Sequence, residues 1–480
     1  MSLRQVMAGL AAAAALAVAA AGPAQAQSAA ERAVEAAKQY SGTEITIVWE
    51  AGLQSLDPLN FSGPKWEELT GIKVKVIEVP TAEMFTKILQ EHRAGTGAYD
   101  ALNVVPTWMA DLVRAGALED LDPYVDKYGF RDELQKIAPT YRDNQMTVDG
   151  KIYGFPDDGD LFILYYRKDL FEDPANKEEF KAKHGYELAA PATWQQYNDI
   201  GNFFTSKLAP TTYGAGQFRQ PPYSQLLFQE RFRVEGGKFF DAESMKATVN
   251  SDIGAKVMDG MREENKFMPA GVESWGFVEA LTAFLNGDIA MTISWPPFGR
   301  WAAGYGVDDA ALSWVPKSKI IDKVGYALPP GGRPQLALGF SLGVSASSKN
   351  KEAAYLFIQW LNSEETSLQR VQLPYALRDP FRESHYTDPE YMARWPDAKH
   401  YLATLRAGAD SGLLDLSLLQ IDKYEEVLRQ AMSRLWAGEP SKDILNDVAA
   451  QWDSLTEKIG VDKQRAAYQE WAGKPNAYPN

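Results

Sequence analysis

Between residues 44 and 116 the sequence alternates between segments typical of strands and segments typical of helices. Residues 44–50 and 72–79 have the apolar pattern of strands, whereas apolar residues in 81–93 recur at helical spacing. A continuous apolar run at 101–105 indicates a further, buried strand. Parallel strands need a crossover between them, usually a helix. The alternation therefore predicts an α/β fold built on a mostly parallel sheet with right-handed crossovers.

The first 26 residues have the pattern of a secretory signal peptide. Arg4 is their only charge, residues 6–21 are apolar and rich in Ala, and Ala24-Gln25-Ala26 has the small-x-small pattern of a cleavage site. A membrane anchor is the alternative, but the apolar run is weakly hydrophobic and ends at Gly22-Pro23. We therefore expect cleavage after Ala26 and export of the remaining chain.

The composition of the 480-residue chain narrows its class. The sequence has no Cys, which excludes disulfides, a lipid-modified Cys and a thiol nucleophile. A net charge of −15 argues against nucleic acids and anionic membrane surfaces as partners. The length exceeds what one hydrophobic core supports, so we expect two lobes.

Three carboxylates, Asp157, Asp158 and Asp160, lie between apolar runs at 152–155 and 161–166. The second run is typical of a buried strand. Because a carboxylate is costly to desolvate, three carboxylates between two buried strands must either stay in contact with water or have binding partners. They lie either in a solvated turn or at the edge of a cleft, where they bind a ligand.

Nine features in a fixed order carry a resemblance to a known family. The signal peptide comes first, and eight motifs follow it: TGIKVKVIEV (70–79), GTGAYD (95–100), GALEDL (116–121), DGKIYGFP (149–156), LYYRKDLF (164–171), TW (193–194), FLNGDIAM (284–291) and LGVS (342–345). Each motif is weak alone. In this order, over nearly the whole chain, they resemble the bacterial extracellular solute-binding proteins of family 1, the maltose-binding-protein-like subunits of ABC importers.

This resemblance implies an α/β, two-lobed periplasmic binding protein fold, in which each lobe is a mostly parallel sheet flanked by helices. The chain crosses the hinge of such a fold three times, here near residues 157, 340 and 382. Residues 27–156 and 341–382 then form the N-terminal lobe, and residues 157–340 and 383–480 form the C-terminal lobe. A ligand binds between the lobes, which close on it.

The implied function is delivery of a sugar, sugar alcohol or short oligosaccharide to the membrane subunits of an ABC importer. Such a protein is expected to be a monomer, to catalyse no reaction, and to need no cofactor or metal. Because the chain is exported and has no lipid anchor, we expect it in the periplasm.

Candidate ligand-binding residues lie at strand ends, where ligands of open α/β sheets bind. Glu50 closes the first predicted strand, and Trp108 follows the strand at 101–105. A carboxylate accepts hydrogen bonds from hydroxyl groups, and an indole covers the apolar face of a sugar ring. The alternatives are a solvated strand end for Glu50 and core packing for Trp108.

The resemblance adds further candidates. Relatives place a sugar-binding carboxylate at the position of Asp160, a ring-stacking Trp at that of Trp295, and a loop near the cleft at that of Arg378. Weaker candidates with the same chemical groups are Asp157, Asp158 and Trp275. A turn stays open for the aspartates, and core packing stays open for both Trp residues.

Two other classes of protein stay open. A secreted glycoside hydrolase also uses carboxylates and aromatic rings in a cleft. A binding protein for a cationic solute, such as a polyamine, would suit the three aspartates. GFSLG at 339–343 matches a nucleophile motif, but apolar residues continue past its Ser where a sharp turn is needed. The four His residues have no metal-ligand spacing, and 157–160 lacks the Glu of a calcium loop.

Overall fold

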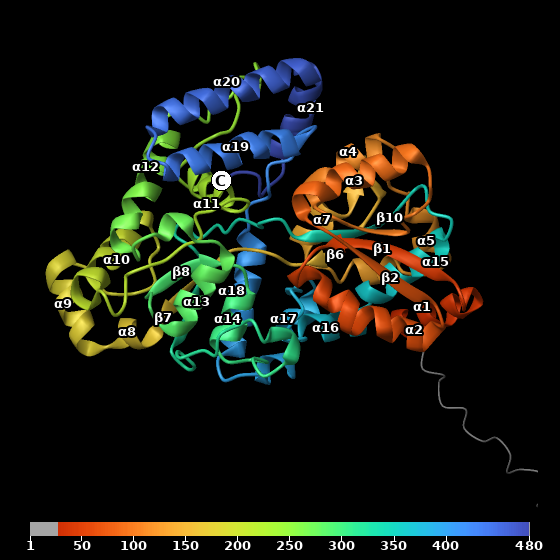
Figure 1. Ribbon diagram of the computed structural model, residues 1–480, viewed down its shortest axis with the longest axis horizontal. Coiled ribbons are helices and arrows are strands. Elements are labelled where there is room, and N and C mark those ends of the chain that lie inside the picture. The colour runs from red at the N-terminus through yellow and green to blue at the C-terminus, as the bar shows by residue number, and fades with distance from the viewer. Residues whose placement is uncertain (1–26, 480) are drawn as a thin grey trace, which may run out of the picture.

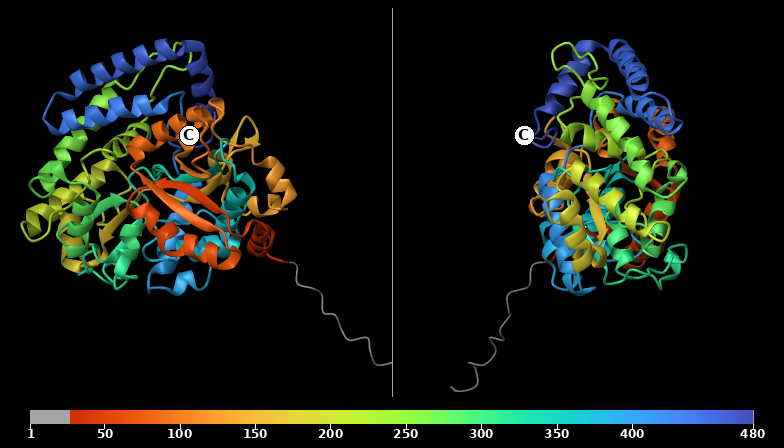
Figure 2. Two further views of the ribbon diagram at one scale, coloured as in Figure 1. Left: turned by 45° about the vertical axis from the view of Figure 1, so that its right-hand side comes forward. Right: turned by 90° about the vertical axis from the view of Figure 1, so that its left-hand side faces the viewer.

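The computed structural model describes residues 27–479, so the predicted signal peptide lies outside the described residues. Two lobes stand side by side (Figure 1), and the molecule is much narrower when it is seen edge-on (Figure 2). Three C-terminal helices cover the top of one lobe in Figure 1: α19 (Ile421–Trp436), α20 (Ser441–Ile459) and α21 (Val461–Ala472).

The first lobe contains a five-stranded sheet. Its strands in spatial order are β2 (Lys73–Val79), β1 (Glu44–Glu50), β3 (Ala101–Val104), β10 (Phe340–Val344) and β6 (Phe155–Asp158). Strand β1 pairs in parallel with both β2 and β3, as the alternation of strands and helices predicts. Strand β10 is antiparallel to β3 and β6, because it is formed by a segment that returns from the other lobe.

Helices flank this sheet, and a short hairpin accompanies them. They are α1 (Ala29–Ala37), α2 (Gly63–Thr70), α3 (Thr81–Ala94), α4 (Met109–Arg114), α5 (Asp122–Lys127), α6 (Arg131–Leu134), α7 (Pro139–Gln145), the hairpin β4 (Thr147–Val148) and β5 (Lys151–Ile152), α15 (Lys351–Asn362) and α16 (Glu364–Val371).

The second lobe corrects one part of the predicted fold. Its sheet has the order β8 (Met291–Ser294), β7 (Ile163–Arg167) and β9 (Val324–Ala327), and both pairings are antiparallel rather than mostly parallel. The apolar runs at these strands correctly predict burial, because helices cover the sheet. A strand that is buried on both faces has the same apolar pattern whether it runs parallel or antiparallel to its neighbour. The direction of these strands is determined by the long connections between them.

The remaining helices belong to the second lobe. They are α8 (Lys168–Glu172), α9 (Pro174–His184), α10 (Trp194–Leu208), α11 (Ser224–Val234), α12 (Asp252–Glu264), α13 (Phe277–Asn286), α14 (Pro297–Ala302), α17 (Glu383–Thr387) and α18 (Ala398–Ser411). Helices α19 and α20 pack on α11 and α12, which joins the C-terminal segment to this lobe. No helix within residues 27–479 is both long enough and apolar enough to cross a membrane.

The chain passes between the two sheets after β6, before β10 and between α16 and α17. The first and third passages lie side by side, because the N–H of Gly159 donates a hydrogen bond to the Asp379 carbonyl at 3.1 Å. These passages lie near the predicted crossings at 157, 340 and 382, and the lobe boundaries at those residues stay a prediction. Away from the passages, the Gln420 N–H donates to Asp111 Oδ2 at 2.7 Å, so the lobes also touch at α4 and α19.

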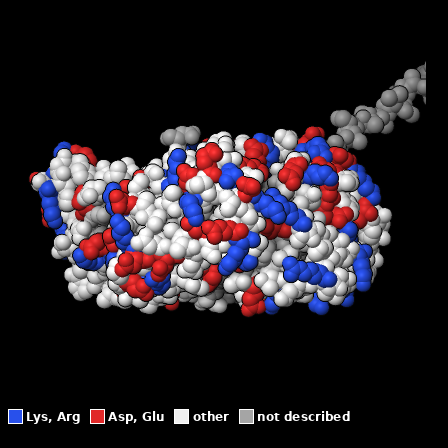
Figure 3. All heavy atoms as spheres, turned by 90° about the horizontal axis from the view of Figure 1, so that it is seen from above, with Lys and Arg blue, Asp and Glu red and all other residues white. Residues whose placement is uncertain are grey.

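The charged residues are mixed on the face of the molecule seen from above. Lys and Arg side chains alternate with Asp and Glu side chains over the described residues of this face (Figure 3). Its electrostatic field is therefore that of many neighbouring opposite charges rather than of one extended acidic or basic surface.

Candidate functional site

A pocket of about 230 Å³ lies between the two lobes. Both lobes and the segments that connect them contribute its walls, which are formed by Glu50, Ala51, Leu53, Gln54, Asp160, Tyr223, Phe277, Val278, Trp295, Pro297, Leu338, Phe340, Leu377 and Asp379. Of the predicted binding residues, Glu50, Asp160 and Trp295 line this pocket. Glu50 ends β1 and Trp295 directly follows β8, so the strand ends place both side chains at the cleft.

The Trp295 indole forms a fixed aromatic wall. Its ring is stacked on Phe218 with the centroids 5.4 Å apart, and Phe162 meets it edge-on at 4.8 Å. The indole N–H donates a hydrogen bond to the Ala337 carbonyl at 3.1 Å. The residue is 8% exposed. Because its side chain is already held in one orientation, a ligand that packs against it causes little further loss of side-chain entropy.

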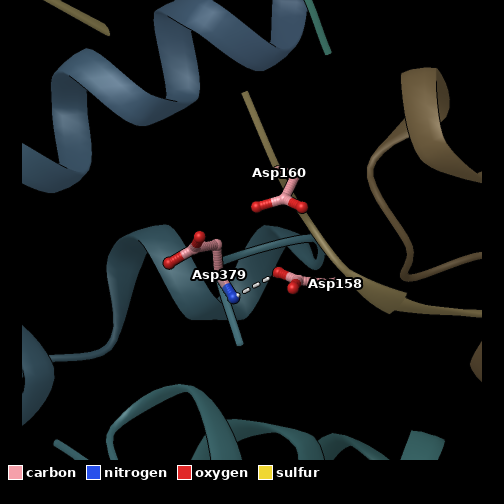
Figure 4. A group of neighbouring side chains, drawn as sticks. All are labelled: Asp158, Asp160 and Asp379. Carbon is pink, nitrogen blue, oxygen red and sulfur yellow. Dashed lines mark hydrogen bonds between the residues drawn. The ribbon is translucent and has the colours of Figure 1, made fainter. Parts of the chain in front are cut away.

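Two carboxylates, Asp160 and Asp379, lie where the first and third passages meet (Figure 4). Asp160 Oδ2 accepts a hydrogen bond from the Gly339 N–H at 3.3 Å, and Asp379 Oδ1 accepts one from Arg300 at 3.3 Å. Asp379 Oδ2 is buried without a hydrogen-bond partner among the described residues. Together with Asp158, they bring three carboxylate oxygens within 4.8 Å of one another.

Burial and mutual repulsion favour the protonated forms of these groups. Burial, followed by the charges of Asp158 and Asp379, raises the pKa of Asp160 well above its usual range. Burial likewise raises the pKa of Asp379 to about 8, although Arg300 opposes this shift. Without a cationic neighbour in the pocket, this pair therefore retains a proton near neutral pH.

Glu50 lines the same pocket from the end of β1. Its carboxylate accepts a hydrogen bond from the Thr81 hydroxyl at the start of α3. Burial nevertheless raises its pKa to about 7, against the opposing effects of Thr81 and Arg378. Three walls of one pocket thus carry carboxyl groups that resist ionisation.

The stability of the unliganded protein should fall as these carboxyl groups ionise. Their folded-state pKa values of about 7 for Glu50 and about 8 for Asp379 exceed the unfolded value of about 4. The stabilising contribution is therefore complete below about pH 4 and is lost as the pH rises through the folded pKa values. The Tm of Asp379→Asn minus that of the wild type should increase from about pH 5 to about pH 8. Calorimetry checks this, with the exposed Asp410→Asn as the matched control, and a constant difference for Asp379→Asn would contradict it.

Asp157, Asp158 and Arg378 lie behind the pocket and do not line it. Asp157 contacts Arg370 at 2.7 Å and Arg378 at 2.9 Å, and Asp158 accepts hydrogen bonds from Gln54 and the Asp379 N–H. All three are fully buried, which excludes the solvated turn for the two aspartates. Burial raises the pKa of Asp158 to about 6 despite the nearby Arg378. Their role in this arrangement is to join the passages between the lobes.

The two other predicted Trp residues lie apart from this pocket. Trp108 lines an adjoining pocket of about 80 Å³, which shares the side chains of Tyr223 and Leu338 with the first. Trp275 packs against Gly216, and its carbonyl accepts a hydrogen bond from the Arg219 N–H at 2.8 Å. Trp108 thus lines only the adjoining pocket, and Trp275 lines neither of the two.

Sequence reasoning missed Gln54, Tyr223, Phe277 and Asp379. Tyr223 directly precedes α11, and Phe277 is the first residue of α13. At such positions no periodic sequence pattern shows whether a side chain faces a cleft or the outer surface. Asp379 directly follows Arg378, close to the predicted third crossing. Its position near that crossing is the sequence signal that could have identified it as a binding residue. Gln54 lies in a single 3-10 helical turn (Leu53–Ser55) after β1, close in sequence to Glu50.

The three neighbouring carboxylates are a poor set of ligands for a metal ion. A calcium ion takes six to eight oxygen ligands, and Asp158 already accepts hydrogen bonds from Gln54 and from a main-chain N–H. The guanidinium groups of Arg300 and Arg378 already contact Asp379 and Asp158, at 3.3 and 3.9 Å, so too few free oxygens remain for the coordination sphere of a metal ion. We assign no metal to this group.

Comparison with known proteins gives the family. Residues 20–367 match the family described as bacterial extracellular solute-binding protein. A periplasmic-binding protein of Sinorhizobium fredii, named as that of a probable amino-acid ABC transporter, is 27% identical over 391 residues, 79% of this chain and 81% of that protein. The erythritol/L-threitol-binding protein of Mycolicibacterium smegmatis is 26% identical over 394 residues, 76% of each chain. A solute-binding protein of Agrobacterium radiobacter K84, solved with ribitol, has a TM-score of 0.70 at 20% identity and covers 86% of this chain and 99% of that one.

The family match covers more than half of the chain, and the structural match covers most of both chains. These matches confirm the two-lobed fold, apart from the strand directions of the second sheet. They also confirm that the protein belongs with solute-binding proteins of transporters rather than with hydrolases. The chain is a member of the bacterial extracellular solute-binding protein family.

Proposed function

We propose that this protein is a monomeric periplasmic subunit of an ABC importer that delivers a sugar, a sugar alcohol or a short oligosaccharide. One observation carries the proposal: both lobes contribute to a single pocket that combines carboxylates with aromatic rings. Carboxylates accept hydrogen bonds from hydroxyl groups, and aromatic rings cover the apolar faces of sugars. Closure of the lobes on such a ligand distinguishes the loaded from the empty protein.

The names of the relatives support a polyol or a sugar as the ligand of this protein. One relative is named for erythritol and L-threitol, and a protein of the same fold was solved with ribitol. Another is named for amino-acid transport, but an amino acid also presents a carboxylate that needs a cationic partner. Within residues 27–479, no Lys or Arg side chain lines the pocket. A neutral hydroxylated ligand fits these walls better than one with a carboxylate.

The sequence and the family support the proposed location and partners. The leader sequence directs export, and the absence of Cys leaves no site for a lipid anchor on that residue. We therefore place the mature protein in the periplasm, where it docks on the membrane subunits of its importer. A net charge of −15 disfavours nucleic acids as partners.

A ligand screen tests this function. The mature protein is heated with individual sugars, sugar alcohols, oligosaccharides, amino acids and polyamines, and a bound ligand raises its Tm. Each ligand that raises the Tm is then incubated with the protein and analysed for cleavage. Stabilisation by a carbohydrate that stays intact supports the proposal. Stabilisation by amino acids alone, or cleavage of the ligand, would overturn it.

Trp295→Ala should weaken carbohydrate binding by ~1–3 kcal/mol, because it removes the aromatic wall that follows β8. Isothermal titration calorimetry on the folded variant measures the change. Trp295→Phe keeps an apolar ring and should lose less affinity. Trp275→Ala is the matched control, since this Trp does not line the pocket, and the affinity of that variant should stay near that of the wild type. Unchanged affinity in a folded Trp295→Ala protein removes this residue from the site.

A further inference from the structure

The charges around the pocket are not balanced. Glu50, Asp160 and Asp379 line it, whereas the nearest guanidinium groups lie outside the lining and are shared among several partners. Arg300 donates to the carbonyls of Val371 and Ala376 as well as to Asp379. Arg370 and Arg378 are shared between Asp57 and Asp157 on the far side of the passages. The pocket walls therefore have an excess of negative charge when their carboxyl groups ionise.

The polar groups of the walls are also mostly acceptors. The Trp295 N–H is bonded to Ala337, and the Gln54 amide N–H is bonded to Asp158 at 3.0 Å. Among the described residues of the lining, the Tyr223 hydroxyl and the second N–H of the Gln54 amide are the remaining side-chain donors apart from protonated carboxyl groups. A sugar hydroxyl both donates and accepts, whereas an ammonium group has three donors and no acceptor. These walls match a ligand that donates more hydrogen bonds than it accepts.

Aromatic side chains stand beside the carboxylates. Tyr223 meets the Trp295 ring edge-on with the centroids 5.0 Å apart, and Phe277 lies 6.0 Å from the same ring. The negative faces of such rings attract a cation, and the attraction increases where water is excluded. Asp379 Oδ2, buried without a partner among residues 27–479, is an acceptor that such a cation would satisfy.

We propose that this pocket selects sugars or sugar alcohols that carry a protonated amino group, and that Asp160 and Asp379 bind the ammonium nitrogen. The inference rests on the proposed function and specifies its ligand class. The ammonium group takes the place of the proton that the two carboxyl groups share when the pocket is empty. The hydroxyl groups of the same ligand then donate to Glu50 and pack with the rest of the ligand against Trp295.

The raised pKa values of Asp160 and Asp379 support this exchange of a proton for a cation. The ionisable groups that surround the pair and affect its proton affinity are Glu50, Tyr141, Asp158, Tyr165, Tyr223, Arg300, Arg378, Tyr386, Tyr391 and Tyr401. Binding of the amine should therefore release protons into the solution, whereas binding of the neutral counterpart should release none.

The test uses matched pairs of ligands that differ only in one group. Titration calorimetry at about pH 6.5 compares glucose with glucosamine, galactose with galactosamine, and sorbitol with 1-amino-1-deoxysorbitol. The amino member of the pair that fits should bind about 10-fold or more tightly, because an ion pair replaces a neutral hydrogen bond. Repeating the titration in buffers of different ionisation enthalpy should show proton release for the amino member.

Two variants locate the effect. Asp160→Asn and Asp379→Asn keep the size and shape of the side chain, and each should abolish most of the preference for the amine. Asp410→Asn, an exposed residue on α18, should retain the full preference. Circular dichroism confirms that each variant is folded before the titrations are compared.

Each remaining outcome overturns the inference in a distinguishable way. Neutral members that bind as tightly as their amino partners overturn the ligand class and leave carbohydrate delivery standing. A preference for the amine that persists in both Asn variants places the cation elsewhere. Binding of a polyamine without binding of any sugar or sugar alcohol overturns both the inference and the proposed function.

Discussion

Replacing Arg370 with leucine is expected to lower the free energy of unfolding by about 3–5 kcal/mol, because it leaves two buried carboxylates, Asp57 and Asp157, with Arg378 as their one shared counter-charge. Arg370 lies on α16 and is 1% exposed. Its guanidinium group contacts Asp57 at 2.5 and 2.8 Å and Asp157 at 2.7 Å. Asp57 and Asp157 come from segments that are far apart in the sequence, so this one side chain joins three parts of the first lobe.

Urea denaturation followed by tryptophan fluorescence measures this effect. Arg434→Leu on α19 is the matched control, because its partners Glu439 and Asp447 are exposed and such pairs contribute about 0–1 kcal/mol. Adding Asp57→Asn to Arg370→Leu should recover part of the loss, since it removes one of the stranded charges. Equal losses in Arg370→Leu and Arg434→Leu would show that the buried pairs add nothing beyond surface pairs.

Gly159→Ala is expected to lower the free energy of unfolding by about 3 kcal/mol or more. A Cβ atom at this position would lie 2.0 Å from the Pro380 oxygen and 2.6 Å from the Pro380 carbonyl carbon. These are main-chain atoms, which cannot rotate away as a flexible side chain does. The same residue accepts a hydrogen bond from the Tyr141 hydroxyl at 2.9 Å, so the passage has little freedom to shift.

Gly276→Ala is the control for this substitution. A Cβ atom there would meet only the flexible Glu279 carboxylate, at 3.2 Å, and the change should cost about 0.5 kcal/mol or less. Both variants are compared by urea denaturation. A Gly159→Ala protein as stable as Gly276→Ala would mean that the first and third passages separate easily.

The first sheet was largely predictable from the sequence because its signals are local. The strand predicted at residues 44–50 is β1, Glu44–Glu50, and the helices between the early strands fix their parallel direction. The direction of the strands in the second sheet was not predictable in this way. Strands β7 and β8 pair across more than a hundred residues of intervening helices, and their apolar runs are the same in either direction.

The candidate site was predictable only in part, for a related reason. Asp157 and Asp160 are three residues apart in one acidic segment, yet one contacts Arg370 behind the passages and the other lines the pocket. The arginines that decide this difference come more than two hundred residues later. Local sequence identifies a costly cluster of charges, whereas the partner of each charge depends on which distant segments the fold brings together.

The carboxylates at the meeting of the first and third passages have a consequence for the order of recognition. When one lobe rotates about the passages, each residue moves in proportion to its distance from the rotation axis. Asp160 and Asp379 lie on the passages themselves and would stay nearly still in such a rotation, whereas Tyr223 and Trp295 would move with their lobe. An open molecule would therefore already present these carboxyl groups, and closing would add the aromatic walls. The charge of a ligand should then mainly affect its association rate. The shape of a ligand should mainly affect its dissociation rate, and so the time that it stays bound.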